Sequence, residues 1–304
     1  MTFRGARKQA ERELARAGVP EPETDARFLL EDACGISMTE YYVCMNEEMP
    51  SGQLEKYRDL IRKRCSRIPL QRLTGEQEFM GLTFAVLPDV LIPRQDTEIL
   101  AEEAIRHLEN LSCGGKGGHP EMMPGREPKI LRVLDLCTGS GCLAVSIKHF
   151  CPEVRMTASD CSQAALEAAE RNAERNGADV EFLQSDLFDK IEGSFDLIVC
   201  NPPYIASGEI PSLMPEVSRF EPRLALDGGE DGLWFYRKIA EQSPDFLNPG
   251  GSLFFEIGSA QGGVVSFILE KNGFQEIRIV RDLAGLDRVA AGRISAERRC
   301  LEYV

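Results

Sequence analysis

Residues 195–200 form a largely apolar run that is typical of a buried parallel strand, and the tetrapeptide Asn201-Pro202-Pro203-Tyr204 follows it directly. We therefore expect the tetrapeptide at the carboxyl end of a strand, the edge at which open α/β sheets bind ligands. Two consecutive prolines keep the backbone extended and remove two N–H donors, so the carbonyls stay free to accept. The Asn201 oxygen and a neighbouring carbonyl suit a planar NH2 group, on a nucleobase or a carboxamide, and Tyr204 offers a flat face. A Pro-rich turn capped by Asn is the purely structural alternative.

A second candidate site lies upstream, where residues 130–136 predict a strand and residues 143–150 predict a helix. The sequence Cys137-Thr138-Gly139-Ser140-Gly141-Cys142 joins them, and its small residues let the backbone approach a ligand closely. A dinucleotide fingerprint needs Gly at the first, third and sixth positions of this turn, and Cys stands at the first and the sixth. The pattern therefore argues against hydride transfer.

Acidic residues end two successive predicted strands in this region. Asp135 ends the strand before the Gly-containing turn, and Asp160 follows the next strand at residues 155–159. An acid in the second position can accept hydrogen bonds from both hydroxyls of a ribose. Either Asp alone is better explained as a solvated strand end or a helix cap. Taken in this order, the residues are typical of an S-adenosylmethionine site.

Strands and helices alternate from residue 130 onward, a pattern that predicts a doubly wound sheet. The stretch 205–232 is rich in Pro and Gly and too long for a plain connector, and such loops often close on substrate. We expect the seven strands of the sheet at residues 130–136, 155–159, 180–184, 195–200, 252–256, 274–280 and 299–304, with further helices at 162–176 and 261–271.

The first part of the chain has helical spacing instead and predicts a small helical domain, residues 1–74. A linker at 75–96 contains a predicted hairpin at 78–86, and a catalytic domain spans 97–304. Asp96 is expected to cap a helix that runs to about residue 111. The Gly- and Pro-rich stretch 112–128 is expected to be a flexible insertion without chemistry. The helices of the first domain are expected at 3–17, 24–33, 39–45 and 52–67.

Length and composition agree with a soluble enzyme, which we expect in the cytoplasm. The chain has 304 residues, 43% of them hydrophobic, without an apolar run of 18, and residues 1–8 lack a secretory apolar core. Its ten Cys residues show no C-x-x-C spacing, so we expect free thiols and neither disulfides nor a metal site. The available imidazoles, none beside an obvious nucleophile, are those of His107, His119 and His149.

Net charge argues against tight binding to a nucleic-acid backbone, because the chain carries −14. Residues 1–74 nevertheless hold 13 Lys and Arg against 12 Asp and Glu. This local excess is either a solvated helix face or a docking surface for a macromolecule that is acidic or bound to RNA. The cations that contribute most are Lys56, Arg58, Arg62, Lys63, Arg64, Arg67 and Arg72.

Further motifs accompany these two sites, and together they allow a family to be named. They are residues 74–82 and 90–98, the latter containing Ile92-Pro93-Arg94-Gln95-Asp96-Thr97-Glu98, together with 135–141, 201–204, Glu221-Pro222, Ala225-Leu226 and Gly228-Gly229. With these motifs the chain resembles, over nearly its whole length, the PrmC/HemK family of peptide chain release factor glutamine methyltransferases. The tetrapeptide alone is shared by many amino-group methyltransferases, whereas the combination is far more specific.

The resemblance implies a seven-stranded doubly wound, Rossmann-like methyltransferase domain that uses S-adenosylmethionine, with a small N-terminal helical domain and a linking hairpin. It implies methyl transfer to the glutamine of the Gly-Gly-Gln motif of release factors. Independently of the resemblance, we expect a monomer that binds neither nucleic acid directly nor a membrane. Catalysis would fall to Asn201, Pro202 and Tyr204, and substrate binding to these with Pro203. The cofactor would be held by Asp135, Cys137, Thr138, Gly139, Ser140, Gly141, Asp160, Asp186, Leu187 and Asn201, with Asp186 and Leu187 near the adenine.

Two positions depart from the family pattern. The family often has Gly where Cys137 stands, and Cys fits there if its φ is negative, so we expect cofactor binding to survive. It usually has Pro where Gln95 stands, so the exit from the hairpin is less rigid here.

Other functions remain open on the sequence. A ribosomal-protein glutamine methyltransferase would use the same chemistry, and a nucleic-acid base methyltransferase would use the same tetrapeptide. The acidic balance and the lack of an added target-recognition domain count against the nucleic-acid reading. A non-catalytic binding protein finds no support in the intact tetrapeptide.

Overall fold

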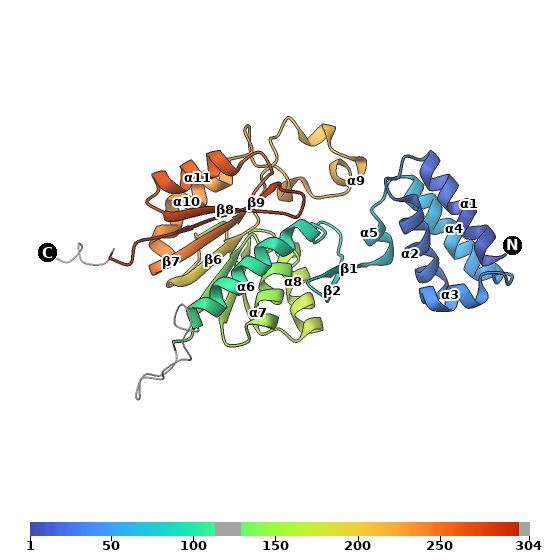
Figure 1. Cartoon of the computed structure of the whole chain (residues 1–304), viewed down its shortest axis with the longest axis horizontal. Helices are drawn as coiled ribbons and strands as arrows, with labels where there is room; N and C mark the ends of the chain where they lie inside the picture. Colours follow the sequence, from blue (N-terminus) through green and yellow to red (C-terminus); the bar gives the residue numbers. More distant parts are fainter. Residues whose placement is uncertain (113–128, 298–304) are drawn as a thin grey trace. The chain divides into compact units, whose positions relative to one another are not determined.

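The computed structural model describes residues 1–112 and 129–297, which divide into two compact units (Figure 1). The first unit contains Met1–Glu76, Val86–Pro88 and Leu213–Phe220. The second contains Gln77–Ala85 and the described residues of Asp89–Ser212 and Glu221–Val304. The chain therefore enters the first unit three times, and one of these entries comes from the long loop at 205–232.

The first unit is built from short helices around an apolar core. The predicted helices are confirmed with ends shifted by at most two residues, and a further short helix, α5, was not predicted. Tyr57 is fully buried, and its hydroxyl donates to the Ala26 carbonyl at 2.8 Å, so α4 is fixed to α2. The helices are α1 (Phe3–Arg16), α2 (Pro22–Cys34), α3 (Met38–Cys44), α4 (Ser51–Cys65) and α5 (Leu70–Thr74).

Ion pairs at the end of α4 explain why Leu213–Phe220 belongs to this unit. Arg64 is buried, with its Nε 2.6 Å from the Asp25 carboxylate and a terminal nitrogen 2.9 Å from Glu216. Arg67 donates twice to Glu216, at 2.6 Å each, in a bidentate pair. Glu216 lies on the short helix α9 (Pro215–Ser218).

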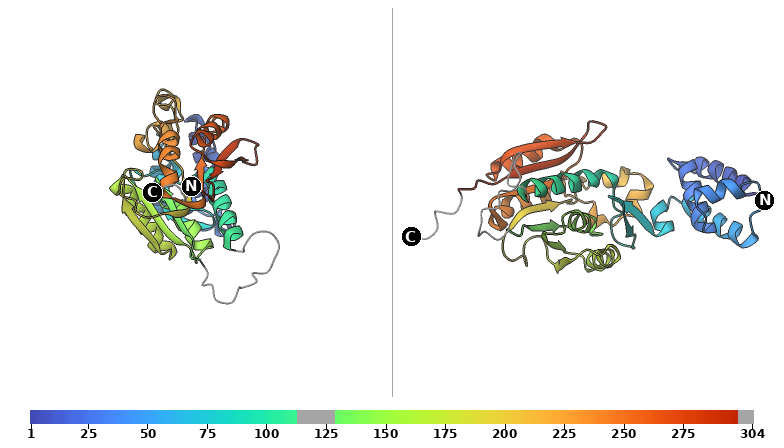
Figure 2. Two further views of the ribbon diagram at one scale, coloured as in Figure 1. Left: turned by 90° about the vertical axis from the view of Figure 1, so that its left-hand side faces the viewer. Right: turned by 60° about the horizontal axis from the view of Figure 1, so that its bottom comes forward.

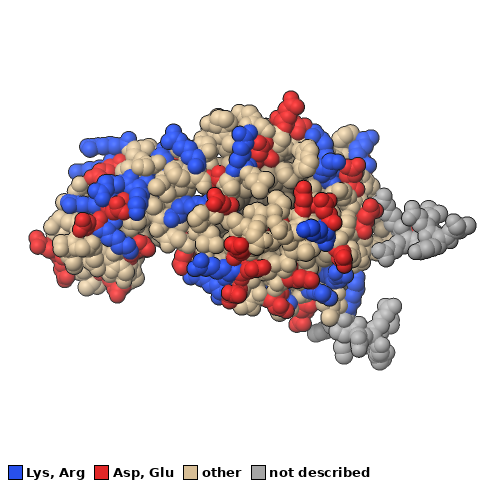
Figure 3. Space-filling view, turned by 180° about the vertical axis from the view of Figure 1, so that it is seen from behind, with Lys and Arg blue, Asp and Glu red and all other residues tan. Residues whose placement is uncertain are grey.

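The predicted basic surface is thus only partly a surface. Arg64 and Arg67 are used inside the unit, and Lys56 pairs with Asp32. Arg62 and Lys63 both pair with Asp59. Figure 3 shows Lys and Arg over the helical unit with acidic side chains among them. The excess positive charge of this segment is therefore largely neutralised by acidic side chains of the same unit.

The second unit contains, within its described residues, a sheet of seven strands in the order β5-β4-β3-β6-β7-β9-β8. Strands β3 to β7 run parallel, whereas β9 is antiparallel to both of its neighbours. The strands are β3 (Arg132–Leu136), β4 (Arg155–Asp160), β5 (Val180–Gln184), β6 (Phe195–Cys200), β7 (Leu247–Glu256), β8 (Gln275–Arg281) and β9 (Asp287–Arg293).

Helices cover both faces of this sheet (Figure 1 and Figure 2), which confirms the doubly wound prediction. Alternate residues of β3 point to opposite faces: Val133 joins one apolar core, and Leu134 joins the other. The first face carries α6 (Glu98–Ser112), α7 (Cys142–Phe150) and α8 (Gln163–Asn176), and the second carries α10 (Trp234–Phe246) and α11 (Gly262–Lys271).

Three sequence predictions need correction or fall outside the description. The seventh strand is β9, which was missed because Ala290-Ala291-Gly292 has low strand propensity. The predicted strand at 299–304 lies outside the described residues, as does the predicted insertion apart from residue 112, which belongs to α6. Asp96 lies inside the 3₁₀ helix η1 (Gln95–Thr97), and its carboxylate pairs with Arg288 instead of capping α6.

The predicted hairpin is confirmed as β1 (Glu76–Phe79) and β2 (Leu82–Ala85). Met80 and Gly81 form its turn with φ of 52° and 74°, as a two-residue type I′ connection requires. Asn172 on α8 accepts from the Ala85 N–H at 2.7 Å and fixes β2 to the second unit. Across the described ranges, no helix has the length and apolar character needed to cross a membrane.

Candidate active site

The strand order brings the two predicted sites together. β3 and β6 are hydrogen-bonded neighbours, with Leu136 opposite Cys200, so Cys137 and Asn201 leave the same edge side by side. The chain builds β3, β4 and β5 outward in one direction and then returns to place β6 on the other side of β3. Such a reversal leaves a crevice at the carboxyl ends of the strands, where α/β proteins bind ligands.

Asp135 lies near the carboxyl end of β3 and is completely buried. Its Oδ2 accepts from the Thr138 hydroxyl at 2.6 Å and from the Ala144 N–H at 3.2 Å. Its Oδ1 has no hydrogen-bond partner among the described residues. Burial raises the pKa of this carboxyl to about 7, against the lowering effect of those two donors. A buried oxygen without a donor is an acceptor that a ligand or an ordered water can satisfy.

The Gly-containing turn is shaped by two glycines that do different things. Gly141 has φ of 80°, and a Cβ there would lie 2.9 Å from the Ala169 Cβ, so this Gly lets α7 pack against α8. Gly139 has φ of 55°, and a Cβ there would meet no atom within 4 Å. Its open side therefore leaves room for a ligand. The Ser140 carbonyl accepts from Asn172 at 2.9 Å, which holds the turn to α8.

Asp160 ends β4 and reaches across to the turn. One oxygen accepts from the Gly139 N–H and the other from the Ser162 N–H, both at 2.9 Å. Burial raises the pKa of Asp160 against these hydrogen bonds. Each carboxylate oxygen has a second lone pair, so Asp160 can still accept from a ligand hydroxyl.

The next strand, β5, brings Asp186 and Leu187 to the same edge, because Asp160 pairs with Gln184 across β4 and β5. Asp186 is exposed, and Leu187 is half-buried with φ of 46°. A positive φ at a bulky residue costs about 1–2 kcal/mol and is found where surrounding contacts impose it. The hydroxyl of Ser185 donates to the Leu187 carbonyl at 2.9 Å and stabilises this turn.

Cys137 departs from the expectation stated for it. Its φ is 58°, so the residue adopts the left-handed conformation that favours Gly, and the condition of a negative φ is not met. Its thiol hydrogen bonds with the Cys200 thiol, and burial raises the pKa of Cys200. The side chain is thus directed toward β6, and the cost of the conformation is about 1–2 kcal/mol.

The tetrapeptide presents the expected pair of acceptors. Asn201 Nδ2 donates to the Thr97 hydroxyl oxygen at 3.2 Å. Neither Asn201 Oδ1 nor the Pro202 carbonyl accepts a hydrogen bond from any residue in the described part of the chain. Pro202 and Pro203 are buried, whereas Asn201 and Tyr204 are half-buried at the edge of the sheet.

The loop after the tetrapeptide folds back and hydrogen bonds to Ile205, the residue that follows the tetrapeptide. The Ile205 N–H donates to the Leu226 carbonyl at 3.0 Å, and the Gly228 N–H donates to the Ile205 carbonyl at 2.8 Å. A Cβ on Gly228 would lie 2.9 Å from both the Pro203 oxygen and the Tyr204 Cα. The Gly228-Gly229 motif is therefore needed for this close approach of two backbones.

Polar residues of the segment 92–98 each hold a different part of the second unit. Arg94 pairs with the buried Glu221 at 2.6 Å, and Glu98 accepts from the Met80 N–H at 2.7 Å. Gln95, where the family usually has Pro, begins the 3₁₀ helix η1. The segment thus fixes Thr97 beside Asn201.

Sequence reasoning missed Glu256, the last residue of β7. It is 2% exposed, and its Oε1 accepts from the Tyr204 hydroxyl at 3.3 Å. Thr97 also hydrogen bonds to this carboxyl, whose pKa burial raises to about 7. A signal was present in the sequence, because an acid ends an apolar strand here just as Asp135 does.

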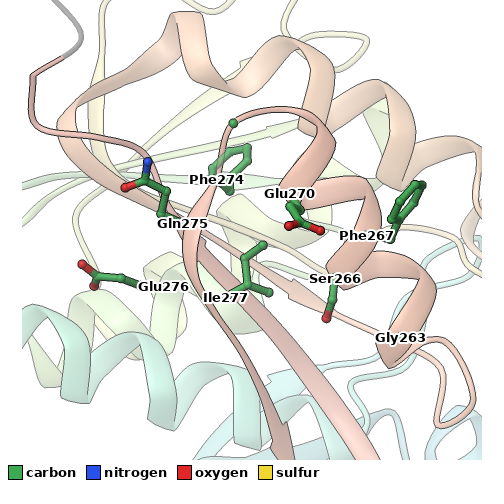
Figure 4. Close-up of a pocket in the computed structure, with 9 residues that line it drawn as sticks. Gly263, Ser266, Phe267, Glu270, Phe274, Gln275, Glu276 and Ile277 are labelled. Carbon is green, nitrogen blue, oxygen red and sulfur yellow. The ribbon is translucent and has the colours of Figure 1, made fainter.

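A separate hollow of about 730 Å³ lies between α11 and β8 (Figure 4). Phe267, Glu270 and Gln275 are among its lining residues, and none of the predicted site residues is. It is a wide, open depression, so its size does not make it the reaction site.

Comparisons with known proteins identify the family. Residues 5–75 match the family described as PrmC N-terminal domain, and residues 122–216 match the Methyltransferase small domain. The release factor glutamine methyltransferase of Geobacter sulfurreducens is 40% identical over 92% of this chain and 93% of its own. That of Deinococcus radiodurans is 37% identical over 96% and 99%.

A solved relative agrees in sequence. The release factor-specific protein-(glutamine-N5) methyltransferase of Alicyclobacillus acidocaldarius is 36% identical and covers 70% of this chain and 99% of its own. Its TM-score against this chain is 0.39. By its extended identity to these relatives, this chain belongs to the release factor glutamine methyltransferase family.

Proposed function

We propose that this protein transfers a methyl group from S-adenosylmethionine to the side-chain amide nitrogen of the glutamine in the Gly-Gly-Gln motif of peptide chain release factors. The observation that carries the proposal is the pair of free acceptors, Asn201 Oδ1 and the Pro202 carbonyl, beside the crevice at β3. A carboxamide presents two N–H groups in one plane and matches such a pair. The names of the relatives support the choice of glutamine.

The residues around the crevice fit the cofactor. The unpartnered Oδ1 of Asp135 is an acceptor for its amino group, and the open side of Gly139 leaves space for it. Asp160 keeps lone pairs for ribose hydroxyls, and Asp186 and Leu187 lie one strand further, where the adenine is expected. The remaining residues assigned to the cofactor are Cys137, Thr138, Ser140, Gly141 and Asn201. When bound, S-adenosylmethionine supplies an electrophilic methyl group on a positively charged sulfur.

Asn201 and Pro202 act on the glutamine. An amide nitrogen is a poor nucleophile because its lone pair is delocalised into the carbonyl. Accepting one N–H at Asn201 and the other at Pro202 orients the nitrogen and favours its pyramidal form as the transition state develops. Tyr204 packs on the amide plane, and Pro203 keeps the backbone extended. A strong general base is then not required.

The parts of the chain divide this work. Residues 1–74 dock the substrate protein, 75–96 connect, and 97–304 carry out the transfer. Because most of the basic segment is paired with local acids, docking relies on shape and on the remaining exposed cations such as Arg58. We assign the protein to the cytoplasm, where release factors act, as a monomer.

Mass spectrometry of a release factor's Gly-Gly-Gln peptide, before and after incubation with the protein and S-adenosylmethionine, tests the function. A gain of one methyl group on the glutamine is expected, and a Gln→Glu substrate should gain none. Comparable transfer to a ribosomal-protein glutamine, or to duplex DNA, would overturn the assignment of the acceptor.

A further inference from the structure

A chain of hydrogen bonds runs from the interior of the second unit to Asn201. Glu256 lies at its inner end, where its backbone carbonyl accepts from the Tyr236 hydroxyl at 3.0 Å and fixes the residue in place. The Thr97 hydroxyl hydrogen bonds to the Glu256 carboxyl. At the outer end, Asn201 Nδ2 lies 3.2 Å from Thr97 Oγ1. Thr97 and Glu256 are each 2% exposed, so water does not compete for these groups.

The protons in this chain can be arranged in one way when Glu256 is ionised. A carboxylate can only accept hydrogen bonds, so the single hydroxyl proton of Thr97 must point to Glu256. Thr97 Oγ1 then has only lone pairs left for Asn201. The Asn201 amide must therefore turn its Nδ2 inward, which leaves Oδ1 for the substrate.

We propose that Glu256 is a positioning residue of this enzyme, which acts through the Thr97 hydroxyl to hold the Asn201 amide with Oδ1 facing the glutamine substrate. The proposal rests on the proposed function for the identity of the acceptor. The orientation of the Asn201 amide itself is a property of the free protein and can be tested without substrate.

Protonation of Glu256 reverses the arrangement. A neutral carboxyl can donate to Thr97 Oγ1, and the Thr97 hydroxyl is then free to donate to Asn201. The Asn201 amide would turn its Oδ1 inward and its NH2 outward. The Asn201 NH2 group would then face the NH2 group of the substrate glutamine. Two donors cannot hydrogen bond to each other, so the alignment that the reaction needs would be lost.

The surroundings of Glu256 place this change near neutral pH. Burial is the largest influence and raises the pKa to about 7, while Thr97 and Tyr204 lower it by donating hydrogen bonds. The negative charge of Asp96 on η1 raises it, and Arg288 on β9 lowers it. Tyr236 on α10 and Cys142 on α7 are further titratable groups that interact with the carboxyl. Glu256 Oε2 accepts no hydrogen bond within the described ranges, which further favours the protonated form.

Turnover against pH, with cofactor and Gly-Gly-Gln substrate both saturating, tests the proposal. The wild-type rate should rise about tenfold per pH unit below a midpoint near 7 and reach a plateau above it. Glu256→Gln should remove this dependence and stay about tenfold or more below the plateau. Glu103→Gln, which removes a buried carboxylate on α6, should leave the midpoint in place. An unchanged plateau or an unchanged midpoint in Glu256→Gln would overturn the role of Glu256.

Thr97 gives a matched pair that separates a relay from general packing. Thr97→Ser keeps the hydroxyl and should retain most of the wild-type turnover. Thr97→Val keeps the shape, loses the hydroxyl and should fall about tenfold or more at saturating substrate with little change in cofactor affinity. Equal turnover in the two variants, with both folded, would show that the hydroxyl is not needed.

A readout without substrate distinguishes failure of the relay from failure of the proposed function. In protein with ¹⁵N-labelled Asn, the Asn201 NH2 signals, identified by their absence in Asn201→Ser, should shift with a midpoint near pH 7. They should not titrate in Glu256→Gln. A pH-independent wild-type signal contradicts the relay, whereas a titrating signal in a protein that methylates no Gly-Gly-Gln substrate contradicts only the assigned acceptor.

Discussion

The Asp160 carboxylate accepts a hydrogen bond from the Gly139 N–H at 2.9 Å, so the end of β4 holds the turn that follows β3. The two acidic residues that indicated a cofactor site in the sequence therefore have different structural roles. Asp135 is buried beneath the turn and keeps one oxygen without a partner in the described structure, whereas Asp160 both shapes the turn and keeps lone pairs for a ligand.

Asp160→Ala should weaken binding of S-adenosylmethionine by about 1–3 kcal/mol, because ribose hydroxyls lose their acceptor and the Gly139 N–H loses its partner. Isothermal titration calorimetry measures the change. Asp189→Ala, an exposed residue of the turn after β5, serves as the control and should bind normally. Wild-type affinity in Asp160→Ala would remove this residue from the cofactor site.

Asn201→Ala should keep the fold and most cofactor affinity and reduce turnover on a release factor at least about a hundredfold, the scale lost with one preorganised polar contact. Single-turnover rates with saturating cofactor measure this effect, and calorimetry checks the cofactor affinity. A loss confined to cofactor affinity, with turnover unchanged at saturation, would place Asn201 outside the acceptor site.

Gly141→Ala and Gly139→Ala should fail for different reasons. At Gly141 the new methyl group meets Ala169 and the φ is unfavourable, so the free energy of unfolding should fall by about 2–4 kcal/mol. At Gly139 only the φ is unfavourable, so the loss should be about 1–2 kcal/mol. Gly139→Ala should nevertheless lose more cofactor affinity, since its methyl group enters the open side of the turn. Urea unfolding measures the stability of both variants, and calorimetry measures their affinity for the cofactor. A larger loss of stability in Gly139→Ala, or a larger loss of affinity in Gly141→Ala, would contradict this prediction.

Cys137→Gly should stabilise the protein by up to about 1 kcal/mol, because relief of the left-handed conformation exceeds the entropy that Gly adds to the unfolded chain. Cys137→Val should destabilise it, since a β-branched residue tolerates φ of 58° poorly. Thermal unfolding of the two variants measures the difference. A Gly variant less stable than wild type would show that the thiol contact with Cys200 outweighs the strain.

Glu216→Gln should lower the free energy of unfolding by about 1–3 kcal/mol at pH 7 and have no effect near pH 2. Burial alone would raise the pKa of Glu216, but hydrogen bonds from Arg67 and Arg64 outweigh it and lower the pKa to about 2. A folded-state pKa below the unfolded value of 4.5 gives stability that is present above pH 4.5 and lost as the pH falls toward 2. Thermal unfolding of wild type and variant from pH 2 to 7 tests this, with the exposed Glu55→Gln as control. If the stability difference between wild type and Glu216→Gln persisted at pH 2, packing and not charge would account for it.

The sequence predicted the catalytic edge well because its evidence is local. Residues 195–200 and 180–184 are strands with the predicted bounds, and the carboxyl ends of parallel strands must meet at one edge. β9 was missed since its Ala and Gly residues carry little strand preference, and it is held as a strand by pairing on both sides with β7 and β8.

Long-range side-chain contacts account for what sequence reasoning could not reach. The part that Thr97 plays depends on contacts with Asn201, 104 residues away, and with Glu256. The basic segment looked like a surface because the acids that neutralise Arg64 and Arg67 include Glu216, far along the chain. Neither periodicity nor local spacing contains this information.

The separation of Arg67 and Glu216 by 149 residues has a consequence for synthesis of the protein. The helical unit is the first part of the chain to leave the ribosome, yet it includes Leu213–Phe220. At 5–20 residues per second, roughly 7–30 s pass between the emergence of α5 and that of α9. During this interval the Arg67 side chain lacks its bidentate partner, while four parallel strands, β3 to β6, are already being made. The amino-terminal unit therefore reaches its final form only after much of the sheet has been translated, and its last step of folding belongs to the carboxyl-terminal half of the chain.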